Sequence, residues 1–315
     1  VLPIAESRIK VKDRLRPGKM LLVDTVKGEL IDDDELKEKY ATKQPYGEWL
    51  DNNLVQLHDL KIPNQKVPMH TKEERARLQK AFGYTYEDLK TSILRMALNG
   101  SESIGAMGID TPLAVLSNKH QPLFNYFKQL FAQVTNPPID SIREKVVTST
   151  TVYLGTDGNV LEEKAENCKQ LKINDPILTN TDLLKIKNMK VDGFKVETIP
   201  IIYYKNTSLE KAIDHLFVEV DRAHREGANI IILSDRGVDE NHVAIPSLLA
   251  VSALQQYLVQ TKKRTAMAVI LESGEPRDVH HFATLLGYGA SAINPYLAQE
   301  SIQELIDLNM LDKDY

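Results

Sequence analysis

The sequence has almost no cysteine: Cys168 is the only one in 315 residues. A single thiol excludes an internal disulfide framework and any iron–sulfur cluster ligated by cysteines of this chain alone. A catalytic thiol needs a histidine and an electropositive setting, and the residues around Cys168 offer neither. We therefore predict that this thiol is inert.

Long apolar runs are also missing. The longest, Val243–Leu254, is broken by Pro246 and Ser247 and is too short to cross a bilayer. The first fourteen residues, VLPIAESRIKVKDR, place charges where a signal peptide has its apolar core. We predict a soluble, cytoplasmic protein with no membrane partner. The start at Val1, without a methionine, suggests an excised fragment.

A positive charge excess is absent as well. The chain has 39 basic and 44 acidic side chains, a net charge of -5, and a pI near 6.0, which argues against a nucleic-acid partner. Its 42% hydrophobic and 26% charged residues are enough for a sizeable core. We predict one large domain with appendages.

The stretch from Ile104 to Glu144 is dense in glycine, proline, asparagine and aromatic residues. This composition predicts one helix, from Pro122 to about Gln133, between two loops of fixed shape. The stretch has no GK[ST] phosphate loop and no metal-ligand spacing, so a scaffold is favoured over catalysis. We predict no catalytic, cofactor-binding or metal-binding residue in the chain.

The N-terminal part predicts a β-hairpin, in which KMLLVD and GELI flank residues 25–28, and then a short acidic helix to about Tyr40. Residues 46–70 are interrupted by prolines and are interpreted as a linker. Two helices should follow, at 71–83 with a Thr71/Glu74 capping box and at 85–99. Further on, the sequence suggests a hairpin turning at Asp157-Gly158 and a helical turn at Thr181-Asp182.

After Lys195 the pattern becomes regular. Strands are predicted at 195–204, 229–234, 266–272 and 290–294, with helices between them and after the last. Alternating strands and helices with short loops indicate a parallel sheet with right-handed crossovers. Four such units make an α/β fold equal to half a (β/α)8 barrel.

Polar residues follow three of these strands directly. Because parallel strands end at one edge of a sheet, we expect this strand-end polar cluster to lie on one rim. Asp235, Arg236, Glu272 and Arg277 in particular should be close together. The cluster could grip a polar ligand, but an ion-pair network that joins the loops is favoured, because no cofactor motif lies beside it. Its predicted members are Asp235, Arg236, Glu272, Glu275, Arg277, Asn294 and Tyr296.

Three long strings carry a family resemblance: GAMGIDTPLAVLS, FNYFKQLFAQVTNPPIDSIRE and LESGEPRDVHHFATLLGYGASAINPYLA. In order and spacing they resemble the central domain of the glutamate synthase large subunit. That resemblance implies an FMN-type (β/α)8 barrel, partial or degenerate and without FMN. It also implies a structural role that links amidotransferase and FMN-binding domains and encloses the ammonia tunnel. The parent enzyme makes glutamate from glutamine and 2-oxoglutarate, with FMN and an iron–sulfur cluster.

The resemblance also divides the chain. Residues 1–45 are similar to the end of the amidotransferase domain, residues 46–70 would be the linker, and residues 71–315 the central domain. That central domain would have a helical and loop part, 71–190, and a regular part, 191–315. The nucleophile of the amidotransferase family is an N-terminal cysteine, whereas this chain starts with Val1. We therefore expect the chain alone to be inactive.

Four residues of the Gly- and Pro-rich stretch are candidates for the tunnel or an interdomain contact: Met107, Asp110, Thr135 and Asn136. The family commonly has two acidic residues after Met-Gly, where this chain has Ile109-Asp110. Two other functions stay open, a complete flavin-dependent oxidoreductase and a small-anion binding module. The sequence does not identify the electron donor of the parent enzyme or its oligomeric state.

Overall fold

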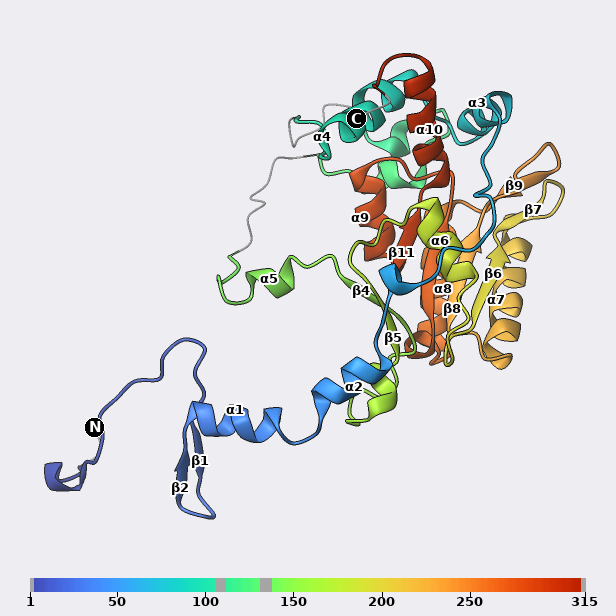
Figure 1. Ribbon diagram of the computed structural model, residues 1–315. Coiled ribbons are helices and arrows are strands. Elements are labelled where there is room, and N and C mark those ends of the chain that lie inside the picture. The colour runs from blue at the N-terminus through green and yellow to red at the C-terminus, as the bar shows by residue number, and fades with distance from the viewer. Residues whose placement is uncertain (1–2, 106–111, 131–137, 313–315) are drawn as a thin grey trace. The chain divides into compact units, whose positions relative to one another are not determined.

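The computed structural model describes residues 3–105, 112–130 and 138–312 (Figure 1). The chain divides into two compact units, residues 1–52 with 138–149 and residues 53–137 with 150–315. The larger unit contains the parallel sheet and therefore every predicted strand-end residue.

The smaller unit contains the predicted hairpin. Strands β1 (Leu22–Asp24) and β2 (Glu29–Ile31) pair antiparallel, and Gly28 closes the turn at φ +70°, where a side chain would be strained. Helix α1 (Asp33–Ala41) follows and is capped by Asp32. Helices α2 (Tyr46–Asn53) and α5 (Glu144–Val147) are short.

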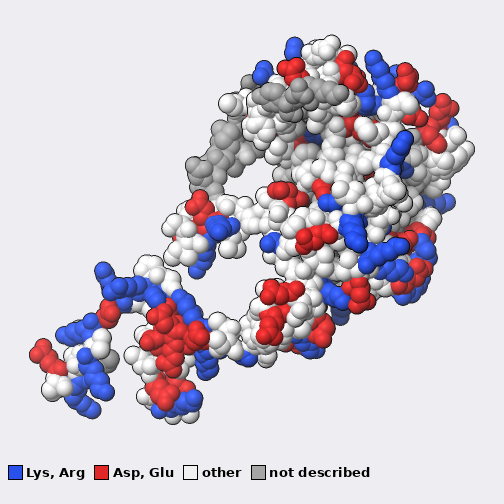
Figure 2. Space-filling view, in the orientation of Figure 1, with Lys and Arg blue, Asp and Glu red and all other residues white. Residues whose placement is uncertain are grey.

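The buried carboxylate of Asp33 ties this hairpin to α1. It lies 2.8 Å from the Nζ atoms of both Lys19 and Lys37 and accepts a hydrogen bond from the Met20 amide. These lysines hold the pKa of Asp33 well below its usual range. Figure 2 shows acidic side chains gathered over α1, with basic ones around them.

The larger unit is organised around four parallel strands in the order β11-β10-β8-β6. The alternation of strands and helices predicted after Lys195 is confirmed. The strands are β6 (Val196–Pro200), β8 (Ile230–Ser234), β10 (Ala268–Glu272) and β11 (Ala292–Asn294). The helices that follow them are α7 (Leu209–Arg225), α8 (Ser247–Gln260), α9 (Val279–Gly287) and α10 (Tyr296–Asp307).

Both faces of this sheet are buried, which explains why its strands are continuously apolar. On one face, Ile231, Val269 and Leu271 pack in a core cluster with residues of α7, α8 and α9. On the other face, Ile232 and Ile270 pack with residues of α6 (Asn180–Lys187) and of a second sheet. Each fully buried side chain of this kind stabilises the fold by about 1.5–3 kcal/mol.

The second sheet has the order β3-β5-β4. Strand β5 (Gln170–Ile173) pairs parallel with β3 (Val55–Gln56) and antiparallel with β4 (Val152–Gly155). Strands β7 (Ile202–Tyr204) and β9 (His242–Ala244) form a separate antiparallel pair. Residues 46–70, predicted as a linker, thus contain all of α2 and all of β3.

The two helices predicted before the Gly- and Pro-rich stretch are present. Helix α3 (Lys72–Ala81) has the expected capping box between Thr71 and Glu74. A π-helical stretch, Asp88–Ile93, continues into α4 (Leu94–Asn99), which ends at the left-handed Gly100. Helix α3 and the helical segment from Asp88 to Asn99 both contact α10. Short 3₁₀ helices lie at Glu6–Arg8, Leu57–Asp59, Ala114–Leu116, Leu123–Phe127, Ala165–Cys168 and Arg264–Ala266.

The predicted helix from Pro122 to Gln133 is wrong for residues 122–130, and the rest of it lies outside the described residues. A 3₁₀ helix covers only Leu123–Phe127, and the backbone is extended at Lys128. The carbonyl of Phe124 accepts a hydrogen bond from His280 Nε2 at 2.8 Å, and the extended backbone at Lys128 ends the turn there. The Phe124 ring is buried and stacks on His281 at 4.3 Å. Tertiary contacts thus replace the helix.

Two strand predictions also need correction. The hairpin at Asp157-Gly158 does not form, because the Asp157 amide donates to the Thr265 carbonyl and β4 pairs with β5 instead. The single strand predicted at 195–204 is two strands, β6 and β7, which belong to different sheets. The break lies at Ile201, whose amide donates to the Ser234 carbonyl and whose carbonyl accepts from the Ile245 amide. The fold is therefore mixed α/β around a four-stranded parallel sheet.

Candidate functional site

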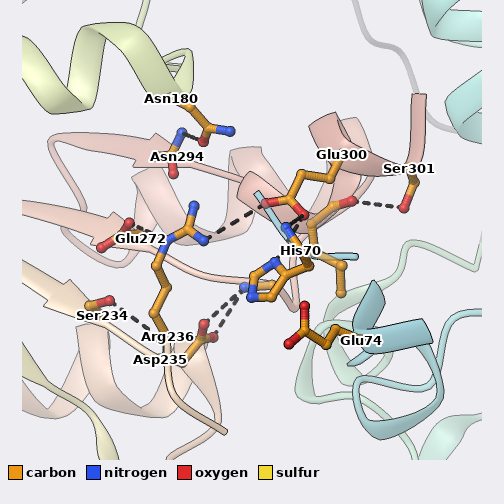
Figure 3. Close-up of polar contacts among 12 residues, drawn as sticks. His70, Glu74, Asn180, Ser234, Asp235, Arg236, Glu272, Asn294, Glu300 and Ser301 are labelled. Atoms are coloured by element: carbon orange, nitrogen blue, oxygen red, sulfur yellow. Dashed lines mark hydrogen bonds and ion pairs between the residues drawn. The ribbon is translucent and has the colours of Figure 1, made fainter. Parts of the chain in front are cut away.

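The polar residues predicted at the strand ends lie at the carboxyl rim of the sheet. Glu272, the last residue of β10, is in register with Ser234 of β8 and with Asn294 of β11. Since the three strands are parallel and end at the same level, their following loops meet there. Figure 3 shows the side chains that gather at this rim.

Glu272 is the centre of an ion-pair network. It is 2% exposed, and its two carboxylate oxygens lie 2.6 Å from Arg236 Nε and 2.6 Å from Lys187 Nζ. Burial works to raise the pKa of Glu272, but Lys187 and Arg236 outweigh it, so this pKa is lowered. The carboxylate is therefore charged at neutral pH and fully paired.

Arg236 connects this pair to helix α10. Its guanidinium carbon lies 4.0 Å from the centre of the Tyr296 ring, and its NH1 lies 3.8 Å from Glu300 Oε1. The other oxygen of Glu300 accepts from the His70 amide at 3.1 Å and lies 2.9 Å from His70 Nδ1. Burial works to raise the pKa of Glu300, but the contacts to His70 and Arg236 lower it on balance.

Asp235 is buried beside this network but has neutral partners. It accepts hydrogen bonds from the Ser273 hydroxyl at 2.5 Å, from the Gly274 amide and from the Tyr296 hydroxyl. Burial raises the pKa of Asp235 to about 7, although these donors work to lower it. Asp235 therefore changes charge near neutral pH, whereas its neighbour Glu272 does not.

Two predicted members of the cluster, Glu275 and Asn294, bind neighbouring loops and take no part in the Glu272 network. The Glu275 carboxylate accepts from the Ser247 amide and hydroxyl at the start of α8. Asn294 donates to the Leu178 carbonyl and to Asn180 Oδ1, both at 3.0 Å.

Arg277 points toward the end of α3. It donates to the carbonyls of Phe82 and Gly83, stacks 4.4 Å over the Tyr84 ring and lies 3.3 Å from Asp88 Oδ2. The rim thus brings together Asp235, Arg236, Glu272 and Tyr296, and the Arg277 guanidinium serves a separate contact.

Three members of the network were not predicted from the sequence: His70, Lys187 and Glu300. His70 and Glu300 are 230 positions apart, so no local pattern connects them. Lys187 had a weak signal, since it lies in the last turn of the helix that precedes β6, where a basic residue is ordinary.

The tunnel candidates Met107, Asp110, Thr135 and Asn136 lie outside the described residues. The described chain between them lines an open groove of about 540 Å³, from Pro112 to Leu130. Its exposed apolar side chains are Leu113, Val115, Leu116 and Tyr126.

In residues 3–105, 112–130 and 138–312, no three His, Cys, Asp or Glu side chains gather as metal ligands would. Of the helices described, none combines the length and apolar character that a bilayer span requires.

Comparisons with known proteins identify the family. The glutamate synthase central domain family matches residues 77–315, and the class-II glutamine amidotransferase family matches residues 1–49. The chain is 44% identical over 315 residues to the glutamate synthase [NADPH] large chain of Bacillus subtilis, covering 100% of this chain and 20% of that protein.

Relatives with other electron donors are nearly as similar. The chain is 41% identical to glutamate synthase [NADH] of Schizosaccharomyces pombe, covering 98% of this chain and 15% of that protein. It is 39% identical to ferredoxin-dependent glutamate synthase 2 of Synechocystis, covering 96% of this chain and 20% of that protein. The chain thus spans only a fifth or less of the length of these relatives. Because the family match covers far more than half of the chain, the chain belongs to the glutamate synthase central domain family.

Proposed function

We propose that this chain is the structural and ammonia-channelling central domain of a glutamate synthase, and that it is not catalytic by itself. It would link an amidotransferase domain to an FMN-binding domain of the same polypeptide, in an enzyme that converts glutamine and 2-oxoglutarate to glutamate. The observation that supports this most is the order of the two family matches, amidotransferase at 1–49 and central domain at 77–315. The division into 1–45, 46–70 and 71–315 is part of the proposal, as is a cytoplasmic location.

The strand-end network supports a scaffold role. Arg236 and Lys187 are both bound by Glu272, and Glu300 is bound by His70. The network therefore neutralises its own charges and connects β8, β10, α6, α10 and the segment before α3. A rim of this kind holds loops together and needs no ligand to be stable.

The residues at the rim do not fit a flavin. A flavin phosphate would meet the buried carboxylates Glu272 and Glu300, whose cationic partners are already engaged. The space beside Gly274 is filled, because a Cβ placed there would lie 2.7 Å from the Phe82 ring and 3.0 Å from the Tyr296 hydroxyl. In this proposal FMN and the iron–sulfur cluster belong to other parts of the polypeptide.

The channelling role is tested in the full-length enzyme with Thr135→Phe. Thr135 stands just before the sequence Asn136-Pro137-Pro138. Two adjacent prolines limit backbone conformations, so such a segment would lose little entropy on lining a tunnel. We expect glutamine hydrolysis to continue while a smaller share of the ammonia reaches 2-oxoglutarate. The matched control is Thr207→Phe, which adds the same bulk at an exposed turn. If hydrolysis and glutamate synthesis stay in step in Thr135→Phe, the channelling role at this loop is wrong.

The scaffold role is tested with the chain itself. We expect no glutaminase activity, no glutamate formation and no flavin absorbance after purification. Bound flavin would instead support a complete flavin-dependent oxidoreductase. A thermal shift with 2-oxoglutarate or glutamate would support a small-anion binding module.

A further inference from the structure

Helix α3 is attached to the rest of the larger unit in an unusual way. None of its residues belongs to any of the three apolar core clusters in the part of the chain described. Its two buried side chains are polar, Arg75 at 4% and Gln79 at 8% exposure. A helix that buries no apolar stripe depends on polar contacts for its position.

Those contacts all fall on one face of α10. Gln79 Nε2 donates to Ser301 Oγ at 2.9 Å and to Glu304 Oε2 at 2.7 Å. Arg75 lies 3.7 Å from Glu304 and 3.8 Å from Asp307, and its buried Nε has no hydrogen-bond partner. Just before the helix, His70 binds Glu300, as Figure 3 shows.

Residues 88–99 contact α10 through different residues, and this contact is apolar. Ile93 packs with Ala298 and Leu305 in an apolar cluster, which also includes Leu89 and Ile302 at its edge. α10 therefore has an apolar contact with residues 88–99 and a charged contact with α3. Salt screens charges and not apolar contacts, so it acts on the second contact, and most strongly at the half-exposed Asp307.

The two ends of this polar segment differ in how they are held. Residues 61–70 have no helix or strand and are mostly exposed. At the other end, Gly83 has φ +68°, and Arg277 holds the carbonyls of Phe82 and Gly83 while its guanidinium stacks on Tyr84. The turn at 82–84 is thus fixed by Arg277, just before α9, whereas α3 is held by its polar contacts to α10.

A second arrangement is available when the segment leaves. Glu300 Oε1 is buried, has no hydrogen-bond partner and already lies 3.8 Å from Arg236 NH1. Without His70, the Glu300 carboxylate can close on Arg236 and keep a charged partner. The open state therefore does not leave an isolated buried charge.

We propose that residues 61–81 form a lid over the carboxyl rim of the sheet, held closed by hydrogen bonds and ion pairs to α10, with the Arg277-bound turn at 82–84 as its hinge. The charged groups that face each other across the closed lid are His70, Arg75, Glu300, Glu304, Asp307 and Arg236. Opening would remove His70 from Glu300 and from the face of the Tyr296 ring, on which Arg236 stacks.

Hydrogen–deuterium exchange of the 315-residue chain tests the lid directly. Helix α6 is the internal reference, because it has a similar length but is anchored by the buried Leu183 and Ile186. Raising NaCl from about 0.05 M to about 1 M shortens the screening length to about 3 Å, so we expect amides of α3 to exchange about tenfold faster. Exchange in α6 should change less than about twofold.

A variant separates the charged contact from general salt effects. Glu304→Gln removes the ion pair with Arg75, so α3 should exchange about fivefold faster at low salt, with little further effect of salt. The matched control is Glu219→Gln, which removes an acid from an ion pair with Arg222 on α7. The proposal is wrong if salt leaves exchange of α3 unchanged, or if α3 and α6 accelerate together. It is also wrong if Glu219→Gln acts on α3 as strongly as Glu304→Gln does.

Discussion

In the middle of the parallel sheet, Leu271 is fully buried among apolar side chains, and one residue further, at the rim, Glu272 is buried at 2% exposure between two cations. The same strand therefore provides both a core residue and a network residue. For Leu271, leaving water is itself favourable. For Glu272, leaving water is costly and is offset mainly by Lys187 and Arg236, with a further hydrogen bond from the Ser234 side chain. Position relative to the strand end decides which rule applies.

The rim contains a second comparison, between its own carboxylates. Glu272 has cationic partners and a lowered pKa, whereas Asp235 has hydroxyl and amide partners and a pKa raised to about 7. Burial is similar for both side chains, at 2% and 1% exposure. The nature of the partners, and not the depth of burial, separates their charge states at neutral pH.

The largest effect is expected in the middle of the sheet. Leu271→Ala should lower the free energy of unfolding by about 3–5 kcal/mol, because it loses apolar burial and leaves a cavity in a close-packed cluster. Chemical denaturation of the chain measures this. A loss below about 1 kcal/mol would show that the site collapses around the smaller side chain.

The next effect concerns pH and Asp235→Asn. The folded pKa of Asp235, about 7, exceeds its ordinary value of 3.8, so its contribution to stability is complete below pH 3.8 and is lost as pH rises through 7. Between these two pH values, the free energy of unfolding of the wild type should fall by about 1 kcal/mol per pH unit because of this group. The variant lacks this loss, so its unfolding free energy relative to wild type should rise by about 2 kcal/mol from pH 5 to pH 8. Parallel stability curves for the two proteins would contradict the raised pKa.

A smaller effect is expected for Lys187→Met, which leaves Glu272 with Arg236 alone. Because Arg236 still pairs and Lys187 is partly exposed, we expect a loss of about 1–2 kcal/mol, less than for a fully broken buried pair. The control is Lys190→Met, at an exposed position three residues further along the chain, which should stay within about 0.5 kcal/mol of wild type. Adding Glu272→Gln should recover part of the loss, and strict additivity in this cycle would exclude a coupled pair.

The smallest effect is expected at the start of α3. Thr71→Ala removes the side chain that caps the helix, which costs about 1 kcal/mol. Since α3 buries no apolar residue, this loss should appear mainly as faster amide exchange in residues 72–81. If the midpoint of global unfolding falls as much as in Leu271→Ala, α3 is part of the cooperative core.

Local patterns predicted the elements whose cause is local. The hairpin at 22–31, the capping box at Thr71 and the alternation of strands and helices after Lys195 were all confirmed. Turn glycines, capping oxygens and buried apolar runs act within a few residues, so they are visible in the sequence. The same holds for the rim position of Asp235, Arg236 and Glu272, because parallel strands must end together.

Distant contacts decided the rest. Phe124 has helical spacing with its neighbours, yet its carbonyl binds His280 and its ring enters the core, so a 3₁₀ turn forms instead of a helix. The strand at 152–155 pairs with residues 170–173 because the chain after it binds the loop before β10. Neither partner could be identified from local pattern.

Patterns along the chain were therefore enough to predict the parallel α/β core, the rim on which its polar residues lie and the family to which the chain is similar. They could not predict that His70, Lys187 and Glu300 complete the network, or that Arg277 turns away to hold residues 82 and 83. Burial patterns repeat along the chain, whereas the partner of a buried charge depends on proximity in space. His70 and Glu300 meet across 230 positions because α3 lies on the polar face of α10.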